Sequence, residues 1–318
     1  MMALFNRSGS SRILLLLAAL WVVVILVFAL LRPGMFSAST VTTILQFSTI
    51  LALVSLGQGL VILAGGAGID LSVGGTVSLS VVLATLAVKA GLPPGLIPLV
   101  CIGVGLLLGL FNGVLVTRLK ILPLIATLGT LFIYSGMALA LTGGGAQSGV
   151  PAWLLAWGRG SVLSLPMPFL TLVVPVFLLA AVLLLASAWG RWLLAMGYNE
   201  RSARLVGIPV DRTRLLVYGL SGLLAGLAGL VSLAWLGSAR PNIGQNLELE
   251  SLTAVMLGGI AITGGIGGVG GVIAAVILLV TLKTGLLQLN VNTVWQVGIV
   301  GALLIAVLLI ERLSKRWS

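Results

Sequence analysis

Long apolar runs separated by short breaks recur along almost all of this 318-residue chain. The run 13-ILLLLAALWVVVILVFALL-31 is typical, and about 20 such residues suffice for an α-helix to cross a bilayer. Only 7% of the residues are charged, whereas a soluble domain carries about a quarter. A membrane β-barrel would show alternating segments of about 10 residues, and none occur. We therefore expect an all-α polytopic membrane protein.

The breaks between these runs divide the chain into ten predicted membrane segments. Proline and glycine mark several breaks, as at 32-RPG-34 and 93-PPG-95. The predicted segments are 13–31, 41–64, 71–90, 95–116, 121–142, 167–189, 214–236, 251–263, 267–284 and 293–311. The whole chain, 1–318, is interpreted as one transmembrane domain. Whether 258–271 leaves the membrane or bends within it is left open.

Two glycine-rich breaks, near 65–75 and 258–271, suggest that the domain has two related halves, 1–165 and 166–318. Five crossings in each half would make the repeat inverted, as in many transporters. Glycine-rich breaks alone are a weak signal of a repeat.

The basic residues predict the orientation of these segments. With both termini in the cytoplasm, 12 of the 17 basic residues fall on the inner side, as the positive-inside rule requires. The inner set is Arg7, Arg12, Arg118, Lys120, Arg191, Arg201, Arg204, Arg212, Arg214, Arg312, Lys315 and Arg316. This asymmetry also explains the net charge of +11, so we expect no nucleic-acid partner.

The composition excludes several kinds of chemistry. The chain has no histidine, which removes the commonest acid–base group and metal ligand. Its single cysteine, Cys101, lies in an apolar run and cannot form an intrachain disulfide. No G-x-x-x-x-G-K-[ST] phosphate-binding loop occurs. We therefore expect no metal, no cofactor and no enzymatic activity in this chain.

Asp70 is an acidic residue set between long apolar runs, in 64-AGGAGIDLSVGG-75. An intramembrane carboxylate is a functional candidate by default. The alternative is that Asp70, with Ser72, caps the third segment near its inner end. The glycines, among them Gly66 and Gly68, either allow close helix packing or permit unwound backbone along a solute path.

Mild polar residues occur in other segments, and we assign Asn112, Thr127 and Thr130 to the same candidate path. Hydroxyl and amide groups without carboxylates suit a neutral, polyhydroxylated solute better than an ion. Asn112 would serve equally well as a hydrogen-bonding link between helices.

The longest polar inner loop, 190–214, contains a predicted short helix over 200–207. Asn199 is a fair N-cap, and Gly207 followed by Pro209 is a fair stop. We expect Ala203, Leu205 and Val206 to face a neighbouring element, with Arg201 and Arg204 toward solvent or an acidic partner. The arginines alone would only enforce orientation, but the capped helix is typical of a docking element. The docking candidates are Asn199, Glu200, Arg201, Ala203, Arg204 and Gly207.

A third polar stretch, 237-GSARPNIGQNLELE-250, is expected on the outer side. It is either a solvated loop, with an acidic residue near a helix N-terminus, or a contact for a partner that delivers the solute. The candidates for such a contact are Arg240, Asn242, Glu248 and Glu250.

Four stretches in order resemble the permeases of ribose-type ATP-binding-cassette importers. They are 65-GGAGIDLSVGG-75, 111-FNGVLVTRLKILPLIATLGTL-131, 197-GYNERSARLVGIPVDR-212 and 238-SARPNIGQNLELESLTAVMLGGIAITGGIGGVGG-271. The match covers roughly 40–285. The first stretch reads GGAGID where the family usually has GGID, so this sequence departs from the family pattern beside Asp70.

The resemblance implies a type II importer-like permease of the bacterial inner membrane that carries a small sugar such as ribose, xylose or autoinducer-2. It implies a second permease copy or a sister permease, ATPase subunits that hold ATP and magnesium, and a periplasmic binding protein. In such importers a short cytoplasmic helix docks in the ATPase, which fits 199–207. The alternatives are a relative carrying branched-chain amino acids or nucleosides, an ion-coupled secondary transporter, a channel or an intramembrane enzyme.

Overall fold

The computed structural model describes residues 6–32 and 34–314. Apart from one small hairpin, the regular structure of these residues is helical. The elements in chain order are α1 (Asn6–Leu31), α2 (Ala38–Leu63), α3 (Val73–Lys89), η1 (Pro94–Leu96), α4 (Ile97–Thr117), α5 (Pro123–Thr142), α6 (Ala152–Arg159), β1 (Ser161–Val162), β2 (Leu165–Pro166), η2 (Phe169–Val173), α7 (Val174–Ala186), α8 (Ala188–Tyr198), α9 (Glu200–Leu205), α10 (Val210–Leu236), α11 (Leu247–Leu257), α12 (Val269–Gln288) and α13 (Thr293–Ser314).

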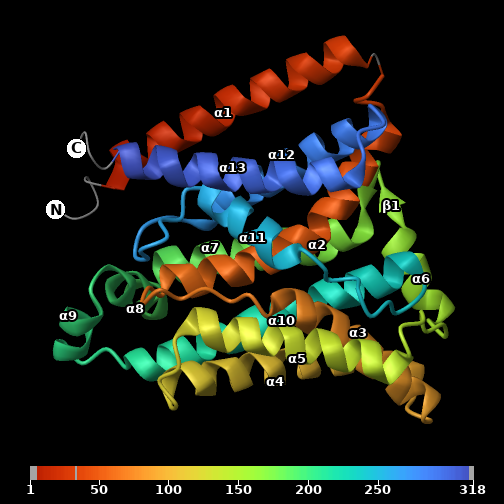
Figure 1. The fold of residues 1–318 in the computed structure, drawn as a ribbon, viewed down its shortest axis with the longest axis horizontal. Coiled ribbons are helices and arrows are strands. Elements are labelled where there is room, and N and C mark those ends of the chain that lie inside the picture. The colour runs from red at the N-terminus through yellow and green to blue at the C-terminus, as the bar shows by residue number, and fades with distance from the viewer. Residues whose placement is uncertain (1–5, 33, 315–318) are drawn as a thin grey trace.

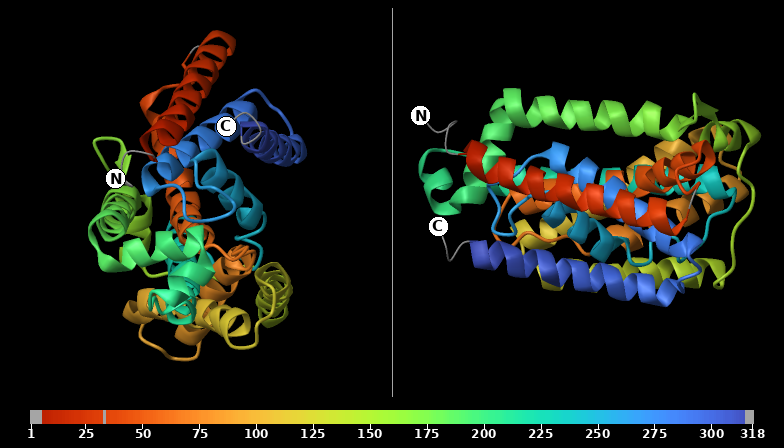
Figure 2. Two further views of the ribbon diagram at one scale, coloured as in Figure 1. Left: turned by 90° about the vertical axis from the view of Figure 1, so that its left-hand side faces the viewer. Right: turned by 90° about the horizontal axis from the view of Figure 1, so that it is seen from above.

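The long helices run along a common axis, and each end of the bundle carries its own short elements (Figure 1). One end carries α8 and α9, and we call it the α9 end. The opposite end carries α6 and the antiparallel hairpin β1–β2. The view from above shows the same division (Figure 2). Lys315 and Arg316, which enter the predicted charge asymmetry, lie outside the described residues.

Proline and glycine set several helix ends, as the sequence predicts. Pro123 occupies the first position of α5, where its missing N–H leaves no intrahelical bond unmade. Gly143 ends α5 and Gly237 ends α10, both in the left-handed conformation that glycine adopts without steric cost. The boundaries of the bundle helices therefore follow from local backbone chemistry.

Each of the ten predicted membrane segments overlaps a helix, although the helix within 251–263 ends at Leu257. Six helical stretches in the described residues are long and apolar enough to cross a membrane. They are Ala38–Leu63, Pro94–Thr117, Pro123–Thr142, Phe169–Ala186, Val210–Leu236 and Val269–Gln288. Leu17–Leu31, Val73–Lys89 and Val294–Leu303 are shorter apolar helices. The predicted helical membrane fold is thus confirmed at this level.

The centre of the bundle is formed by α2 and α10, whose residues are mostly buried, whereas α5 and α7 expose most of theirs. Glycines bring α4 and α10 together. A Cβ added at Gly109 would lie 2.9 Å from the Cα of Gly222, and one added at Gly105 would lie 2.9 Å from the Cα of Gly226. Small residues four apart on each helix permit this close approach, as is common between membrane helices.

Two irregular loops adjoin helices of less than full length. The α2–α3 loop (64–72) joins a 26-residue helix to a 17-residue helix. The α11–α12 loop (258–268) follows α11, which has only 11 residues. Gly265 in the second loop donates its N–H to the Leu63 carbonyl at 3.0 Å. The stretch 258–271 therefore turns back against the end of α2 and the α2–α3 loop.

Candidate functional site

The short helix α9 forms as the sequence predicts. The Asn199 side chain caps it by accepting from the Ser202 N–H at 3.0 Å. The chain leaves the helix at Gly207, whose φ of +84° lies in the left-handed region. The helix is shorter than predicted and ends at Leu205 because Val206 no longer has helical backbone angles.

The faces predicted for α9 are partly wrong. Ala203 is buried, as expected, but Leu205 and Val206 are 82% and 76% exposed. Arg204 is already paired within the chain, because its guanidinium donates to Glu200 and Asp211. The sequence did not predict that the carboxylate of Asp211, at the start of α10, would pair with a side chain of this helix.

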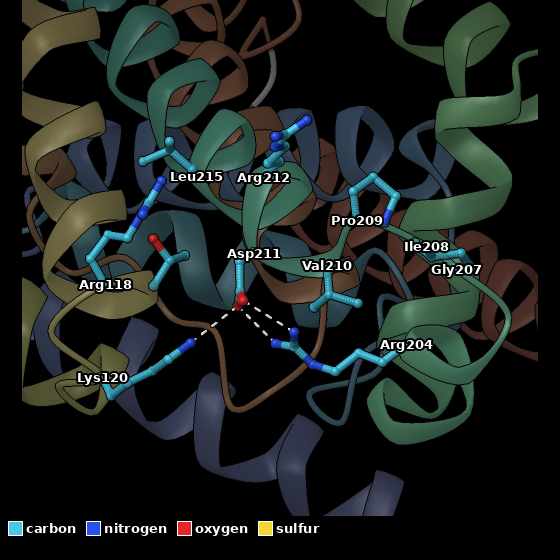
Figure 3. Close-up of a pocket in the computed structure, with 11 residues that line it drawn as sticks. Arg118, Lys120, Arg204, Gly207, Ile208, Pro209, Val210, Asp211, Arg212 and Leu215 are labelled. Carbon is cyan, nitrogen blue, oxygen red and sulfur yellow. Dashed lines mark hydrogen bonds and ion pairs between the residues drawn. The ribbon is translucent and has the colours of Figure 1, made fainter.

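A chain of ion pairs ties α9 to α10 and to the end of α4 (Figure 3). Lys120 Nζ lies 3.2 Å from Asp211 Oδ1, and Arg204 Nη2 lies 2.7 Å from the same oxygen. Arg204 Nη2 also lies 2.9 Å from Glu200 Oε1. Arg214 Nη2 lies 2.7 Å from Glu200 Oε2. Both carboxylates are thus shared between cations, which fixes the position of α9 better than one exposed pair would.

The electrostatics of α9 reflect these pairs. The hydrogen bond from Arg214 is the largest influence on Glu200, and it lowers the pKa of that carboxyl against the opposing effect of burial. The bonds to Asp211 and then Glu200 raise the pKa of Arg204. Glu200 is therefore held ionised at neutral pH.

The ion pairs border an open cavity of about 690 Å³ at the α9 end. Its lining includes four basic side chains and one acidic side chain (Figure 3). These are Arg118, Lys120, Arg204, Arg212 and Asp211. Sequence reasoning counted Arg118, Lys120 and Arg212 toward orientation only, because it had no means of placing the loop after α4 beside α9.

Asp70 is the centre of a buried hydrogen-bond network. Its Oδ1 accepts from the Ser72 N–H at 3.0 Å and from the Ser72 hydroxyl at 2.6 Å. Its Oδ2 accepts from the Ser221 hydroxyl of α10 at 2.8 Å. Asn112 of α4 donates to Ser72 Oγ at 2.6 Å. The N-cap position of α3 is Ser72, which makes no side-chain cap bond, so Asp70 does not occupy the predicted cap position. Its carboxyl instead joins the α2–α3 loop to α10.

Asp70 lies deeper than the sequence suggested. Ser221, its partner, is 11 residues after Val210 in the 27-residue helix α10, which corresponds to about 16 Å along the axis. The reason is visible in Figure 1, where the chain between α2 and α3 runs back from the α9 end toward the middle of the bundle. Ser221 was missed because a serine in an apolar helix gives no distinguishing signal.

The other predicted path residues divide between this network and its surroundings. Thr127 of α5 donates to the Ile69 carbonyl at 3.1 Å and so contacts the α2–α3 loop. Thr130 donates only to Thr127 within its own helix. Gly68 packs against the Val61 carbonyl. Gly66 lies apart from Asp70, beside Arg214.

The stretch predicted for the outer side is split by the structure. Arg240 and Asn242 are exposed, whereas Glu248 and Glu250 are partly buried at the start of α11. Glu250 Oε1 pairs with Lys283 Nζ of α12 at 2.7 Å. The 240–246 segment also turns inward, since Gly244 donates its N–H to Ser78 Oγ of α3. Glu250 is thus engaged within the chain.

The part of the chain that the structure describes contains no group of three His, Cys, Asp or Glu side chains placed to hold a metal ion. The acidic residues at the α9 end are each paired with basic side chains.

A family model described as "Branched-chain amino acid transport system / permease component" matches residues 40–308, which is most of the chain. The chain belongs to this permease family. The Ribose import permease protein RbsC of Bacillus subtilis (strain 168) is 36% identical over 292 residues, covering 91% of this permease and 90% of that protein.

The Autoinducer 2 import system permease protein LsrC of Yersinia pseudotuberculosis serotype O:1b (strain IP 31758) is 35% identical over 313 residues. The match covers 96% of this permease and 85% of that protein. No solved structure matches the permease.

These similarities confirm the family that the sequence resembles. The permease is a multi-pass membrane component of an ATP-binding-cassette transport system, and it is a transport subunit rather than an enzyme. Family membership implies ATPase and binding-protein partners and indicates no cofactor for this chain.

Proposed function

We propose that this permease imports a small neutral sugar, of the ribose or autoinducer-2 type, which a periplasmic binding protein delivers. The support is the two relatives, whose names state ribose and autoinducer 2 import and which align with most of the chain. The amide and hydroxyl groups around the α2–α3 loop are compatible with a hydroxylated solute. A second candidate is a branched-chain amino acid, which the description of the matching family names.

We propose that α9 docks into the ATPase subunit, with 199–207 as the docking segment and ATP and magnesium held by that partner. The observation that carries this proposal is a capped helix at the extreme end of the bundle (Figure 1) with exposed apolar side chains. Tyr198, Leu205 and Val206 are all more than three-quarters exposed. Ion pairs connect the helix to the rest of the bundle, so movement of the helix can be transmitted to the bundle.

The orientation and repeat form part of the same proposal. The α9 end would face the cytoplasm of the bacterial inner membrane, with both termini on that side and ten segments in an inverted 5+5 arrangement. The repeat is supported by two antiparallel units, α2 with α3 and α10 with α11. In each unit a long buried helix is followed by an irregular segment and a shorter helix (Figure 1). The first turn of α3, at Gly74, packs against Gly244 in the segment between α10 and α11.

We further propose that the α2–α3 loop and its partners form the gate of the solute path between two permease copies or sister permeases. The deep position of Asp70 and its bonds to Ser72 and Ser221 support a loop whose shape depends on the packing of α10. The residues assigned to the path remain Gly66, Gly68, Asp70, Ser72, Asn112, Thr127 and Thr130. On the opposite end, Arg240 and Asn242 are the exposed candidates for contact with the binding protein.

Reconstitution tests the function directly. The permease, its ATPase and its binding protein would be placed in proteoliposomes, with radiolabelled ribose and leucine as competing solutes. We expect ribose accumulation that needs ATP and all three proteins and that survives an uncoupler. Accumulation of leucine in place of ribose would favour the second candidate. Accumulation by the permease alone, abolished by an uncoupler, would contradict an ATP-driven importer.

A further inference from the structure

Arg214 is a buried arginine one turn into α10, and it reaches toward α9. The residue is only 9% exposed. Its Nη2 lies 2.7 Å from Glu200 Oε2, at the first position of α9. The sequence placed Arg214 among the orientation charges of a polar loop, but its charge is directed into the protein. A buried guanidinium that loses its carboxylate is strongly disfavoured, so Arg214 and Glu200 should move together.

The backbone of the α2–α3 loop rests directly on this ion pair. A Cβ added at Gly66 would lie 2.5 Å from Arg214 Nη2 and 3.3 Å from Glu200 Oε2. Gly66 also has a φ of +65°, which L-residues adopt only with strain. A side chain at this position would therefore displace the guanidinium, and the loop, the arginine and the glutamate pack directly against one another.

The same face of α10 holds the α2–α3 loop at a second point. Ser221 is seven residues after Arg214, which places both side chains on one side of the helix, about 10 Å apart. Ser221 binds Asp70 Oδ2, and Asp70 is four residues after Gly66. Four extended residues span at most about 14 Å, so the loop follows α10 between these two attachments.

Glycine contacts at the same place bring in the end of α8. A Cβ added at Gly65 would lie 2.7 Å from the Cα of Gly197, in the last turn of α8. Gly264 of the α11–α12 loop also packs on Gly65, with 2.5 Å between its added Cβ and the Gly65 Cα. Displacement of the α8–α9 corner therefore cannot leave the α2–α3 loop unchanged.

We propose that Arg214 is the positioning residue that transmits movement of α9 to the α2–α3 loop, through Glu200 on one side and Gly66 on the other. Arg214 touches neither the solute nor ATP. When the ATPase moves α9, Glu200 moves with the helix and Arg214 follows Glu200. The guanidinium against which Gly66 packs is thereby displaced. This inference rests on the proposed docking of the ATPase at α9 and assigns the first step beyond that contact.

Hydrogen exchange distinguishes the docking of the ATPase at α9 from the transmission of movement through Arg214. It would be measured on the full permease in nanodiscs, with and without its ATPase and a non-hydrolysable ATP analogue. Adding the ATPase should protect amides of 199–207, which tests docking. Adding nucleotide should then change exchange in 64–72, which tests transmission. In Arg214→Gln we expect protection of 199–207 to persist and the nucleotide response of 64–72 to be lost. Arg214→Lys should restore part of it.

The second measurement is the number of ATP molecules hydrolysed per solute imported by the assembled transporter. We expect this ratio to rise about tenfold in Arg214→Gln, within the range of typical coupling energies. Gly66→Ala should do the same, because its methyl group displaces the guanidinium.

Two variants serve as matched controls. Arg191→Gln removes an exposed charge from α8, and Gly143→Ala introduces alanine at a φ of +59° with no heavy atom within 4 Å. Both should keep the wild-type ratio. An unchanged ratio and an intact response of 64–72 in Arg214→Gln would overturn the proposal, whereas failure of the ATPase to protect 199–207 in the wild type would count against docking itself.

Discussion

The Ser221 hydroxyl donates to Asp70 Oδ2 at 2.8 Å, although the two residues lie 151 positions apart in the chain. This bond joins the middle of a long buried helix to a loop that enters the bundle from the α9 end. It closes the network formed by Asp70, Ser72 and Asn112. Both partners are at most 1% exposed, so water cannot replace either one without rearrangement of the helices.

Replacing Ser221 with alanine should destabilise the protein by about 1–3 kcal/mol, because a buried carboxyl oxygen loses its donor. Ser232→Ala is the matched control. Ser232 is equally buried on the same helix, but its hydroxyl bonds only to the Ala228 carbonyl within that helix. The free energy of unfolding in detergent should fall for Ser221→Ala and change little for Ser232→Ala. Equal losses would show that the link to Asp70 adds nothing.

Asp70→Asn should be tolerated far better than Asp70→Leu. The asparagine carbonyl can accept from Ser72, and its amide can donate to the Ser221 oxygen. Leucine leaves both serines without their partner and should cost about 2–4 kcal/mol. Thermal stability and transport are the measurements. A well-folded Asp70→Asn protein that does not transport would instead indicate that the charge itself takes part in function.

Gly109→Ala should destabilise the protein even though alanine favours a helix over glycine by about 1 kcal/mol. The added methyl group would meet the Cα of Gly222 at 2.9 Å and force α4 away from α10. Gly103→Ala, in the same helix with nothing within 4 Å, should be neutral or stabilising. The unfolding curve should therefore shift toward lower stability for Gly109→Ala but not for Gly103→Ala. A shift of the same sign would contradict this packing.

Leu205→Glu should weaken ATPase binding about tenfold or more without loss of stability, because the leucine is 82% exposed on α9. Leu163→Glu provides the control, since Leu163 is 93% exposed at the opposite end of the bundle. Affinity for the purified ATPase would be measured for both. Equal affinity in the two variants would argue that the ATPase binds elsewhere.

Acid should release α9 only below the usual titration range of a glutamate. The pKa of Glu200 is lowered from 4.5, chiefly by the hydrogen bond from Arg214. A depressed pKa contributes stability that is complete above the unfolded value and is lost as the pH falls through the folded value. Carboxyl 13C shifts of Glu200 should therefore titrate below pH 4.5, and in Arg214→Gln they should move back toward it. Titration at or above 4.5 in the wild type would contradict the ion pair.

Much of the fold follows from the sequence because apolar length and proline–glycine punctuation are local properties. The apolar segments and a capped helix beginning at Glu200 were predictable in this way, although that helix was predicted to reach Gly207 and ends at Leu205. The site was less predictable, since it depends on which helices become neighbours. Arg214 has the same local signature as Arg191, yet one is buried against Glu200 and the other is exposed. The depth of Asp70 was misjudged for the same reason, because a re-entering loop cannot be distinguished from a short connection by composition.

The shortness of α11 has a consequence for how the protein is made. Its 11 residues measure about 16 Å, roughly half the hydrocarbon thickness of a bilayer. The insertion machinery selects nascent segments by apolar length, and Glu248 and Glu250 add to the cost of this one. We therefore expect α11 to enter the lipid together with α10 and α12, so that Glu250 meets its partner Lys283 only after α12 has been synthesised.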